Sequence, residues 1–227
     1  MKALVLVGSP RGRGSTSSAL AAYLRRRLEA AGATAEEMTV AAALASTEGQ
    51  HRLHRATDEA DLVVVSFPLY VDQLPAPLVR ALDLVAERRK GGFAATPWSG
   101  PLRQKLAVIV QCGFPESHQN RPAVDIMRLF AREAGFEWAG ALAMGMGGAI
   151  SGRPLEKAGG MARNVVRALD LAAASLAAVG DVPEEAARLM ARPLMPRWIY
   201  NLAANWGFRR QLRKHGVRKR AADRPYA

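Results

Sequence analysis

Short apolar runs alternate along this chain with segments of helical periodicity. The sequence predicts buried strands at residues 3–7, 34–40, 61–67, 106–112 and 137–144. It predicts helices over residues 15–31, 75–89, 122–134 and 155–179. The segment from 41 to 54 fits neither pattern clearly. Because strand and helix alternate, we expect an α/β fold in which helices cover both faces of a doubly wound parallel sheet.

Four polar, glycine-rich or proline-rich loops follow the predicted strands. Their sequences are GSPRGRGSTSS, PLYVDQLPAP, GFPESHQNRP and GMGGAISGRP. The carboxyl ends of parallel strands meet at one edge of a sheet, and the ligands of such sheets bind there. We therefore expect the four loops to share one rim and to form the binding site.

The composition is typical of a globular protein. Hydrophobic residues make up 49% of the 227 residues, and charged residues make up 23%. No apolar run approaches the roughly 20 residues of a membrane span, and the first residues do not form a signal peptide. The one cysteine, Cys112, excludes an internal disulfide and a cysteine-only metal site. These features favour a cytoplasmic protein without a bound metal.

The net charge of +12 is concentrated near the C-terminus, where the chain carries eight Arg or Lys and one Asp from residue 207 onward. No nucleic-acid-binding motif accompanies this cluster, so nucleic acid is not an expected partner. The strand–helix pattern also ends around residues 193–196. The sequence therefore predicts a folded domain over residues 1–192 and a basic, aromatic, helical extension over residues 193–227.

Apolar residues precede the basic cluster of this extension at roughly helical spacing. They are Trp198, Leu202, Trp206 and Phe208. Such a stripe either docks on the folded domain or on a partner subunit, or it lies on a membrane surface. Docking is the arrangement we expect, because it is the commoner use of such a stripe.

The first loop has the composition of an anion site. It leads from a strand into a helix, whose amino end offers unpaired N–H groups and a partial positive charge. Further donors in this loop are Ser9, Arg11, Ser15, Thr16 and Ser17. We expect these groups to bind a phosphate. The alternative is a serine helix cap on a flexible loop whose arginines are solvated.

Two familiar phosphate-binding loops are excluded. A Walker A loop requires Gly-Lys-Ser/Thr, but Arg13, Gly14 and Ser15 stand in that register. Gly8, Gly12 and Gly14 also miss the G-x-G-x-x-G spacing of a dinucleotide-binding fold. ATP hydrolysis and Rossmann-type NAD binding are therefore not expected.

The second loop places apolar and aromatic residues at the same rim. They are Pro68, Leu69, Tyr70 and Val71. Taken alone, such residues most often cap the core. Beside a phosphate-binding loop, they instead predict a ligand that carries both a flat heteroaromatic ring and a phosphate.

The two loops together resemble those of the flavodoxin-like NAD(P)H-dependent FMN reductases. The resemblance lies in GSPRGRGSTSSAL followed by DLVVVSFPLYVDQLPAPLVRALD, and it extends through CGFPE, EWAGALAMGMGGAI and the terminal RPY. It implies a five-stranded sheet in the order 2-1-3-4-5, with FMN at the switch point. Residues 1–192 would then form a flavodoxin-like FMN-binding domain.

The resemblance also implies which residues bind FMN. The phosphate would be held by Ser9, Arg11, Ser15, Thr16 and Ser17. The isoalloxazine ring would lie against Pro68, Leu69, Tyr70 and Val71, and its other side would face Cys112, Gly113, Phe114 and Glu116. Relatives often have Asn where Ser15 stands, which leaves the detail of that contact open.

The implied function is an FMN-dependent NAD(P)H oxidoreductase that passes hydride through bound FMN to a small acceptor such as a free flavin or a quinone. No catalytic acid, base or nucleophile is then required from the protein, because the cofactor carries the chemistry. The alternative is a non-enzymatic flavodoxin-like electron-transfer protein. Such carriers are usually acidic, whereas this chain is basic.

Two further features have more than one interpretation. Cys112 ends a predicted buried strand, so we expect a small core residue rather than a reactive thiol. The glycines between residues 145 and 154 permit close approach of a ligand or of a second subunit, or they form a turn. We expect subunit contact, because the relatives are commonly dimers, and hence a homodimer or a higher homo-oligomer.

Overall fold

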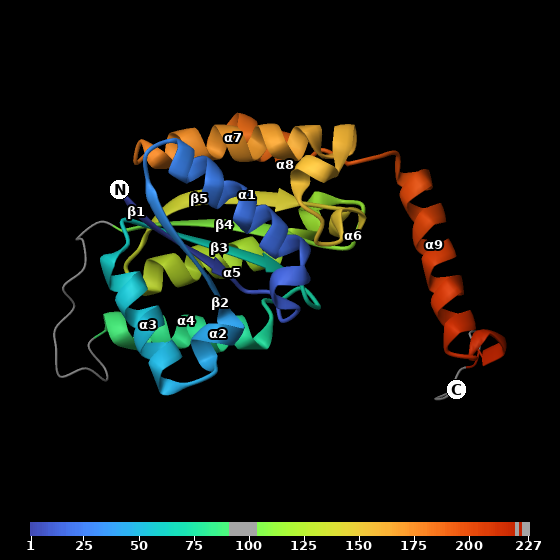
Figure 1. Ribbon diagram of the computed structural model, residues 1–227, viewed down its shortest axis with the longest axis horizontal. Helices are drawn as coiled ribbons and strands as arrows, with labels where there is room; N and C mark the ends of the chain where they lie inside the picture. The colour runs from blue at the N-terminus through green and yellow to red at the C-terminus, as the bar shows by residue number, and fades with distance from the viewer. Residues whose placement is uncertain (91–103, 221–222, 224–227) are drawn as a thin grey trace. The chain divides into compact units, whose positions relative to one another are not determined.

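The five predicted strands form one parallel sheet in the order β2-β1-β3-β4-β5 (Figure 1). The computed structural model describes residues 1–90, 104–220 and 223. The strands are β1 (Lys2–Val7), β2 (Thr34–Thr39), β3 (Leu62–Pro68), β4 (Lys105–Gln111) and β5 (Glu137–Met144). The flavodoxin-like strand order that the sequence predicts is therefore confirmed.

Apolar side chains cover both faces of this sheet. In β1, Val5 and Val7 pack into one core cluster, whereas Leu4 and Leu6 pack into the other. Successive side chains of a strand point to opposite faces, so a strand covered on both sides is apolar at nearly every position. All seven residues of β3 are buried, which explains why this segment is recognisable in the sequence.

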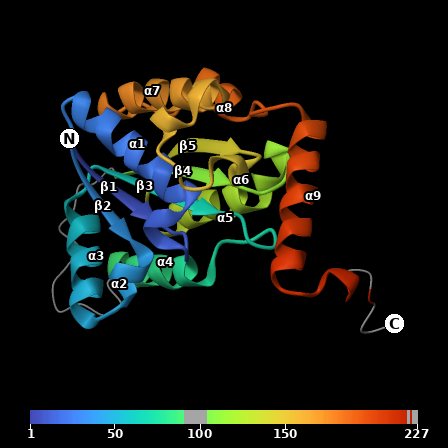
Figure 2. The same cartoon turned by 45° about the vertical axis from the view of Figure 1, so that its right-hand side comes forward.

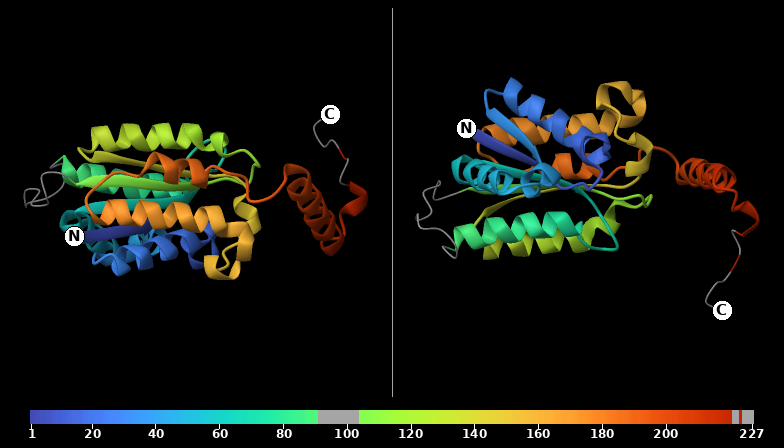
Figure 3. Two further views of the ribbon diagram at one scale, coloured as in Figure 1. Left: turned by 90° about the horizontal axis from the view of Figure 1, so that it is seen from above. Right: turned by 60° about the horizontal axis from the view of Figure 1, so that its bottom comes forward.

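Helices cover the sheet in two layers (Figures 1 and 3). One face carries α1 (Thr16–Ala30), α7 (Arg163–Ala177) and α8 (Glu184–Met190). The other face carries α2 (Val40–Leu44), α3 (Thr47–Glu59), α4 (Ala76–Arg89) and α5 (Arg121–Glu133). The short helix α6 (Gly147–Ile150) follows β5, and 3-10 turns lie at Gly12–Gly14, Ser117–Asn120, Leu155–Lys157 and Gly159–Ala162.

The ambiguous segment from 41 to 54 forms parts of two capped helices. The Thr39 side chain accepts a hydrogen bond from the Ala42 N–H at 3.2 Å at the start of α2. The Ser46 side chain accepts one from the Gly49 N–H at 3.1 Å at the start of α3. Because each cap starts a new helix, no single period runs through this segment.

The expected long helix over residues 155–179 is wrong over residues 155–162. Two 3-10 turns occupy Leu155–Lys157 and Gly159–Ala162, and the α-helix begins only at Arg163. Gly159 has a φ of +63°, which an α-helix cannot accommodate. Helix α8 was not expected from the sequence.

The chain divides into two units, Met1–Leu194 and Met195–Ala227. The second unit contains α9 (Arg197–Lys214) and a 3-10 turn at Arg218–Arg220. Among the described helices, none combines the length and apolar character that crossing a membrane requires. The assignment of residues 1–192 as an FMN-binding domain and 193–227 as its extension stays a prediction.

We expect Leu24→Ala to destabilise the fold. Leu24 lies on α1, is 1% exposed and belongs to the core cluster that residues of the sheet and of α7 share. Removing its side chain leaves a cavity and should lower the free energy of unfolding by about 2–5 kcal/mol. Urea denaturation followed by circular dichroism measures this change. The matched control is Leu129→Ala, because Leu129 is 50% exposed on α5. Equal effects of the two substitutions would contradict the core packing.

Candidate functional site

The loops that follow the strands lie beyond the carboxyl ends of the strands (Figure 2). A hollow of about 170 Å³ lies where these loops meet. The loops after β1, β3 and β4 contribute to it, together with the start of α6 and the residue that follows this helix. The lining residues are Ser9, Arg11, Ser15, Thr16, Pro68, Leu69, Tyr70, Gln111, Cys112, Gly113, Gly147, Gly148 and Ser151. The expectation that these loops share one rim therefore holds for the described residues.

A larger hollow, of about 690 Å³, lies between α3 and α4. Its lining residues are almost all charged or polar, and no loop that follows a strand contributes to it. Ligands of open parallel sheets bind at the strand ends. We therefore take the smaller hollow as the functional site.

The hydroxyls of Ser15 and Thr16 are engaged within the protein. Ser15 caps α1, because its Oγ accepts from the Ser18 N–H at 3.1 Å and donates to the Gly12 carbonyl at 2.7 Å. Thr16 Oγ1 donates to the Gly147 carbonyl at 2.9 Å and so ties the first loop to the fourth. Each hydroxyl has one hydrogen to donate, so neither is free to donate to a ligand in this arrangement.

Other donors at the same helix end are free. Within the described part of the chain, the Thr16 and Ser17 N–H groups have no hydrogen-bond partner. The Ser9 Oγ accepts from the Arg11 N–H at 3.4 Å and keeps its own hydrogen. Among the described residues, the exposed Arg11 guanidinium has no hydrogen-bond or ion-pair partner, and the buried Ser17 Oγ has no hydrogen-bond partner. A helix N-terminus with such donors attracts an anion.

The loop after β3 contains a strained turn. Tyr70 and Gln73 exchange backbone hydrogen bonds of 2.9 and 3.0 Å. Between them, Val71 and Asp72 have φ values of 49° and 58°, which is a type I′ turn. A β-branched residue at positive φ costs about 1–3 kcal/mol. Val71 is 95% exposed, so this strain holds an apolar side chain out in solvent at the rim.

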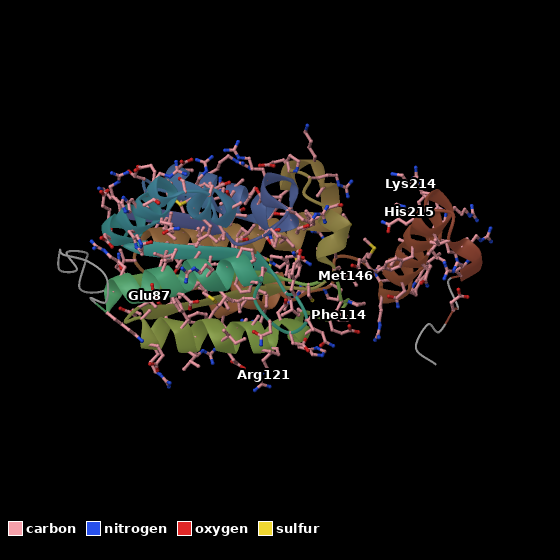
Figure 4. All side chains as sticks on the ribbon, turned by 90° about the horizontal axis from the view of Figure 1, so that it is seen from below. Glu87, Phe114, Arg121, Met146, Lys214 and His215 are labelled. Carbon is pink, nitrogen blue, oxygen red and sulfur yellow. The ribbon has the colours of Figure 1, made fainter. Side chains whose placement is uncertain are left out.

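The loop after β4 lines the hollow mainly through its backbone. The Cys112 N–H donates to the Met144 carbonyl at 3.1 Å, and its carbonyl accepts from the Gly147 N–H at 2.8 Å. The Cys112 side chain is buried, and burial raises the pKa of its thiol. Phe114 is half exposed, and its carbonyl accepts from the Met146 N–H at 2.7 Å (Figure 4).

The fourth loop contributes lining residues that the prediction of the ligand site omitted. They are Gly147, Gly148 and Ser151, and Gln111 at the end of β4 is a further one. A Cβ on Gly147 would overlap the Gln111 side chain, and one on Gly152 would overlap the Gly14 carbonyl. These glycines therefore let the fourth loop pack against the other loops of the same chain. In the sequence, the position of these glycines directly after a predicted strand is the feature that could have indicated that they line the site.

The structure brings most of the predicted residues together. Those that line the hollow are Ser9, Arg11, Ser15, Thr16, Pro68, Leu69, Tyr70, Cys112 and Gly113. Those that do not line it are Ser17, Val71, Phe114 and Glu116. Ser17 is buried within the first turn of α1, whereas Val71 is exposed at the tip of its turn. The contacts of all these residues with a ligand stay a prediction.

The sequence model of the NADPH-dependent FMN reductase family matches residues 1–149. The chain belongs to this family. It is accordingly an NAD(P)H-dependent FMN oxidoreductase, with FMN as cofactor and NAD(P)H as co-substrate. No curated protein matches the chain.

Solved structures are similar to this chain at low sequence identity. An FMN-dependent NADH-azoreductase from Bacillus anthracis str. Ames Ancestor, in complex with FMN, is 14% identical with a TM-score of 0.55; the match covers 78% of this chain and 99% of that one. An azoreductase from Bacillus anthracis str. Sterne is 18% identical with a TM-score of 0.47, covering 78% and 98%. A flavodoxin, WrbA-like protein from Agrobacterium tumefaciens is 15% identical with a TM-score of 0.44, covering 60% and 75%.

Gly152→Ala should weaken FMN binding. Gly152 has a φ of +74°, and a Cβ there would push against the Gly14 carbonyl in the first loop. We expect the dissociation constant to rise at least about ten-fold, because the donors at the start of α1 are displaced. Quenching of flavin fluorescence during titration measures this constant. Gly160→Ala is the control, since a Cβ there meets nothing within 4 Å. An unchanged constant in the Gly152 variant would show that the two loops are not coupled.

Cys112 should behave as an inert core residue. Because burial raises the pKa of its thiol, the reactive thiolate forms only at a pH above the ordinary range for cysteine. Ellman's reagent should therefore label the native protein far more slowly than the urea-unfolded protein at pH 8. Cys112→Ala should keep NAD(P)H oxidation within about two-fold of the parent. Labelling at the unfolded rate, or loss of turnover in this variant, would assign the thiol a functional role.

Proposed function

We propose that FMN binds in the hollow with its phosphate at the amino end of α1. The observation that carries this proposal is the set of free donors there: the Thr16 and Ser17 N–H groups, the Ser9 hydroxyl and the Arg11 guanidinium. Ser15 supports the loop through its cap rather than through a direct contact. The donor chemistry fits a phosphate, because charge-assisted and backbone N–H bonds converge at a positive helix end.

We propose that the isoalloxazine ring lies between the loops after β3 and β4. Pro68, Leu69 and Tyr70 offer apolar surface on one side, and the backbone around Cys112 and Gly113 lines the other. The proposed contacts of Val71, Phe114 and Glu116 require the rim to close over the ligand. Phe114 and Val71 are exposed, so both side chains are free to move toward it.

Bound FMN supplies the hydride-transfer chemistry between NAD(P)H and an acceptor. The residues that line the hollow include no carboxylate, imidazole or lysine amine. The protein's contribution is therefore to hold the phosphate, to orient the ring and to exclude water from it. No side chain is proposed as a catalytic acid, base or nucleophile.

We propose a small acceptor, such as a free flavin or a quinone. The exposed apolar rim at Tyr70, Val71 and Phe114 supports a flat, partly apolar molecule beside the ring. Stopped-flow oxidation of NADH and NADPH with each acceptor class tests this assignment. We also propose that the protein forms a homodimer and that it is located in the cytoplasm.

Arg11→Ala should weaken the binding of FMN but not that of riboflavin, which lacks the phosphate. Loss of one charge-assisted hydrogen bond predicts a rise of about ten-fold in the FMN dissociation constant. Isothermal titration calorimetry with both flavins measures the difference. Arg13→Ala is the matched control, because Arg13 lies on the same loop but does not line the hollow. Equal weakening for the two flavins would place the phosphate elsewhere.

A further inference from the structure

The second unit carries most of the chain's positive charge. Residues 195–227 contain nine Arg or Lys and one Asp, a net +8 of the total of +12. No Asp or Glu occurs between residues 195 and 222. The first unit therefore holds a net +4. Any surface that attracts this segment by charge has to be anionic.

Helix α9 also exposes large apolar side chains, most of them on one side, whereas Phe208, which is 65% exposed, lies outside that side. At 100° per residue, Trp198, Leu202, Trp206 and Ile199 fall within a stripe about 100° wide. Their exposed fractions are 69%, 63%, 65% and 37%, and α9 contains no buried residue. Two tryptophans and two aliphatic residues therefore present a continuous apolar surface to solvent. We call these four residues the apolar stripe.

Basic residues continue the apolar stripe toward the C-terminal end of α9. Arg209 and Arg213 follow Trp206 at spacings of three and seven, so they lie on the same side of the helix. The Arg210 guanidinium stands 5.8 Å from the centre of the Trp206 ring. Lys214 and His215 lie at the end of this helix (Figure 4). Apolar and cationic groups thus occupy one surface, with the cations concentrated at one end.

In place of the docking that the sequence pattern alone favours, we propose that this surface binds an anionic phospholipid bilayer, with α9 lying flat in the headgroup region. Tryptophan rings and aliphatic side chains enter the boundary of the acyl chains, while arginines extend to lipid phosphates. The 18 residues of α9 do not meet the requirements for a membrane span. This binding is independent of the flavin site.

Other occupants fit the surface less well. A second copy of this chain offers no anionic complement in net charge, because both of its units are positive. A nucleic acid would neutralise the arginines but would leave the apolar stripe in water. An anionic bilayer offers acyl chains to the apolar stripe and phosphates to the arginines.

Vesicle flotation of the full-length protein tests the proposal. We expect the protein to float with vesicles of phosphatidylcholine and phosphatidylglycerol, not with phosphatidylcholine alone, and to be released by high salt. The variant Trp198→Ser/Leu202→Ser/Trp206→Ser should lose at least about ten-fold in partitioning. So should Arg209→Gln/Arg210→Gln/Arg213→Gln. Both variants should keep the parent's circular dichroism and FMN affinity, since α9 has no buried residue.

Matched controls lie on α5, where Leu129 is half exposed and the side chains of Arg128 and Arg132 are 61% and 74% exposed. Leu129→Ser and Arg128→Gln/Arg132→Gln should float like the parent. Absence of flotation, or equal binding to neutral vesicles, overturns the proposal. Sedimentation that detects self-association abolished by the apolar variant, without vesicle binding, assigns the surface to a second copy. Preferential binding of duplex DNA that the apolar variant retains assigns it to nucleic acid.

Discussion

Burial of the sheet on both faces is the constraint on which the rest of the structure depends. Because nearly every position of the inner strands is apolar, most of the polar chemistry lies where the strands end. The parallel arrangement places those ends at one edge, so loops distant in the sequence meet there. The Thr16–Gly147 hydrogen bond then fixes the first of these loops to the last. The shape of the site follows from this core and from that one tie.

The site holds several features that do not stabilise the empty fold. Among the residues that the structure describes, the N–H groups of Thr16 and Ser17 lack partners and the Ser17 hydroxyl is buried without one. Val71 also has an unfavourable backbone conformation. The two core clusters must offset their combined cost. In the proposed complex the FMN phosphate would accept hydrogen bonds from the free donors and remove part of that cost, which would link FMN binding to folding stability.

Much of the fold could be predicted because the inner strands have an unambiguous local signature. Residues 61–67 are apolar almost throughout, and the structure has β3 at Leu62–Pro68. The incorrect expectation of an α-helix at residues 155–162 has a local cause as well. The expected helix continues the pattern of α7 toward the N-terminus through Gly159, where the α-helix does not form. In the sequence, the glycine pair at residues 159–160 interrupts the helical pattern only weakly. In the structure, Gly159 adopts a left-handed backbone conformation, which an α-helix cannot accommodate.

The site was predicted less completely, because its details depend on contacts between distant residues. The residue types of the first loop indicated an anion site, but nothing local shows that the Thr16 hydroxyl is engaged by Gly147, 131 residues away. The role of Gly152 depends on its contact with Gly14 in the same way. Sequence patterns identify which loops meet, whereas the free donors can be identified only from the three-dimensional arrangement.

That long separation has a consequence for the growing polypeptide. The first βα unit leaves the ribosome early, but the partner of Thr16 is made only after β5 has been translated. Until then the fourth loop is missing from the rim of the site. Bringing Thr16 and Gly147 together closes a long loop, and the contacts of the sheet must offset the chain entropy that this closure costs. Binding of FMN at the proposed site would therefore follow the synthesis of β5 and the start of α6.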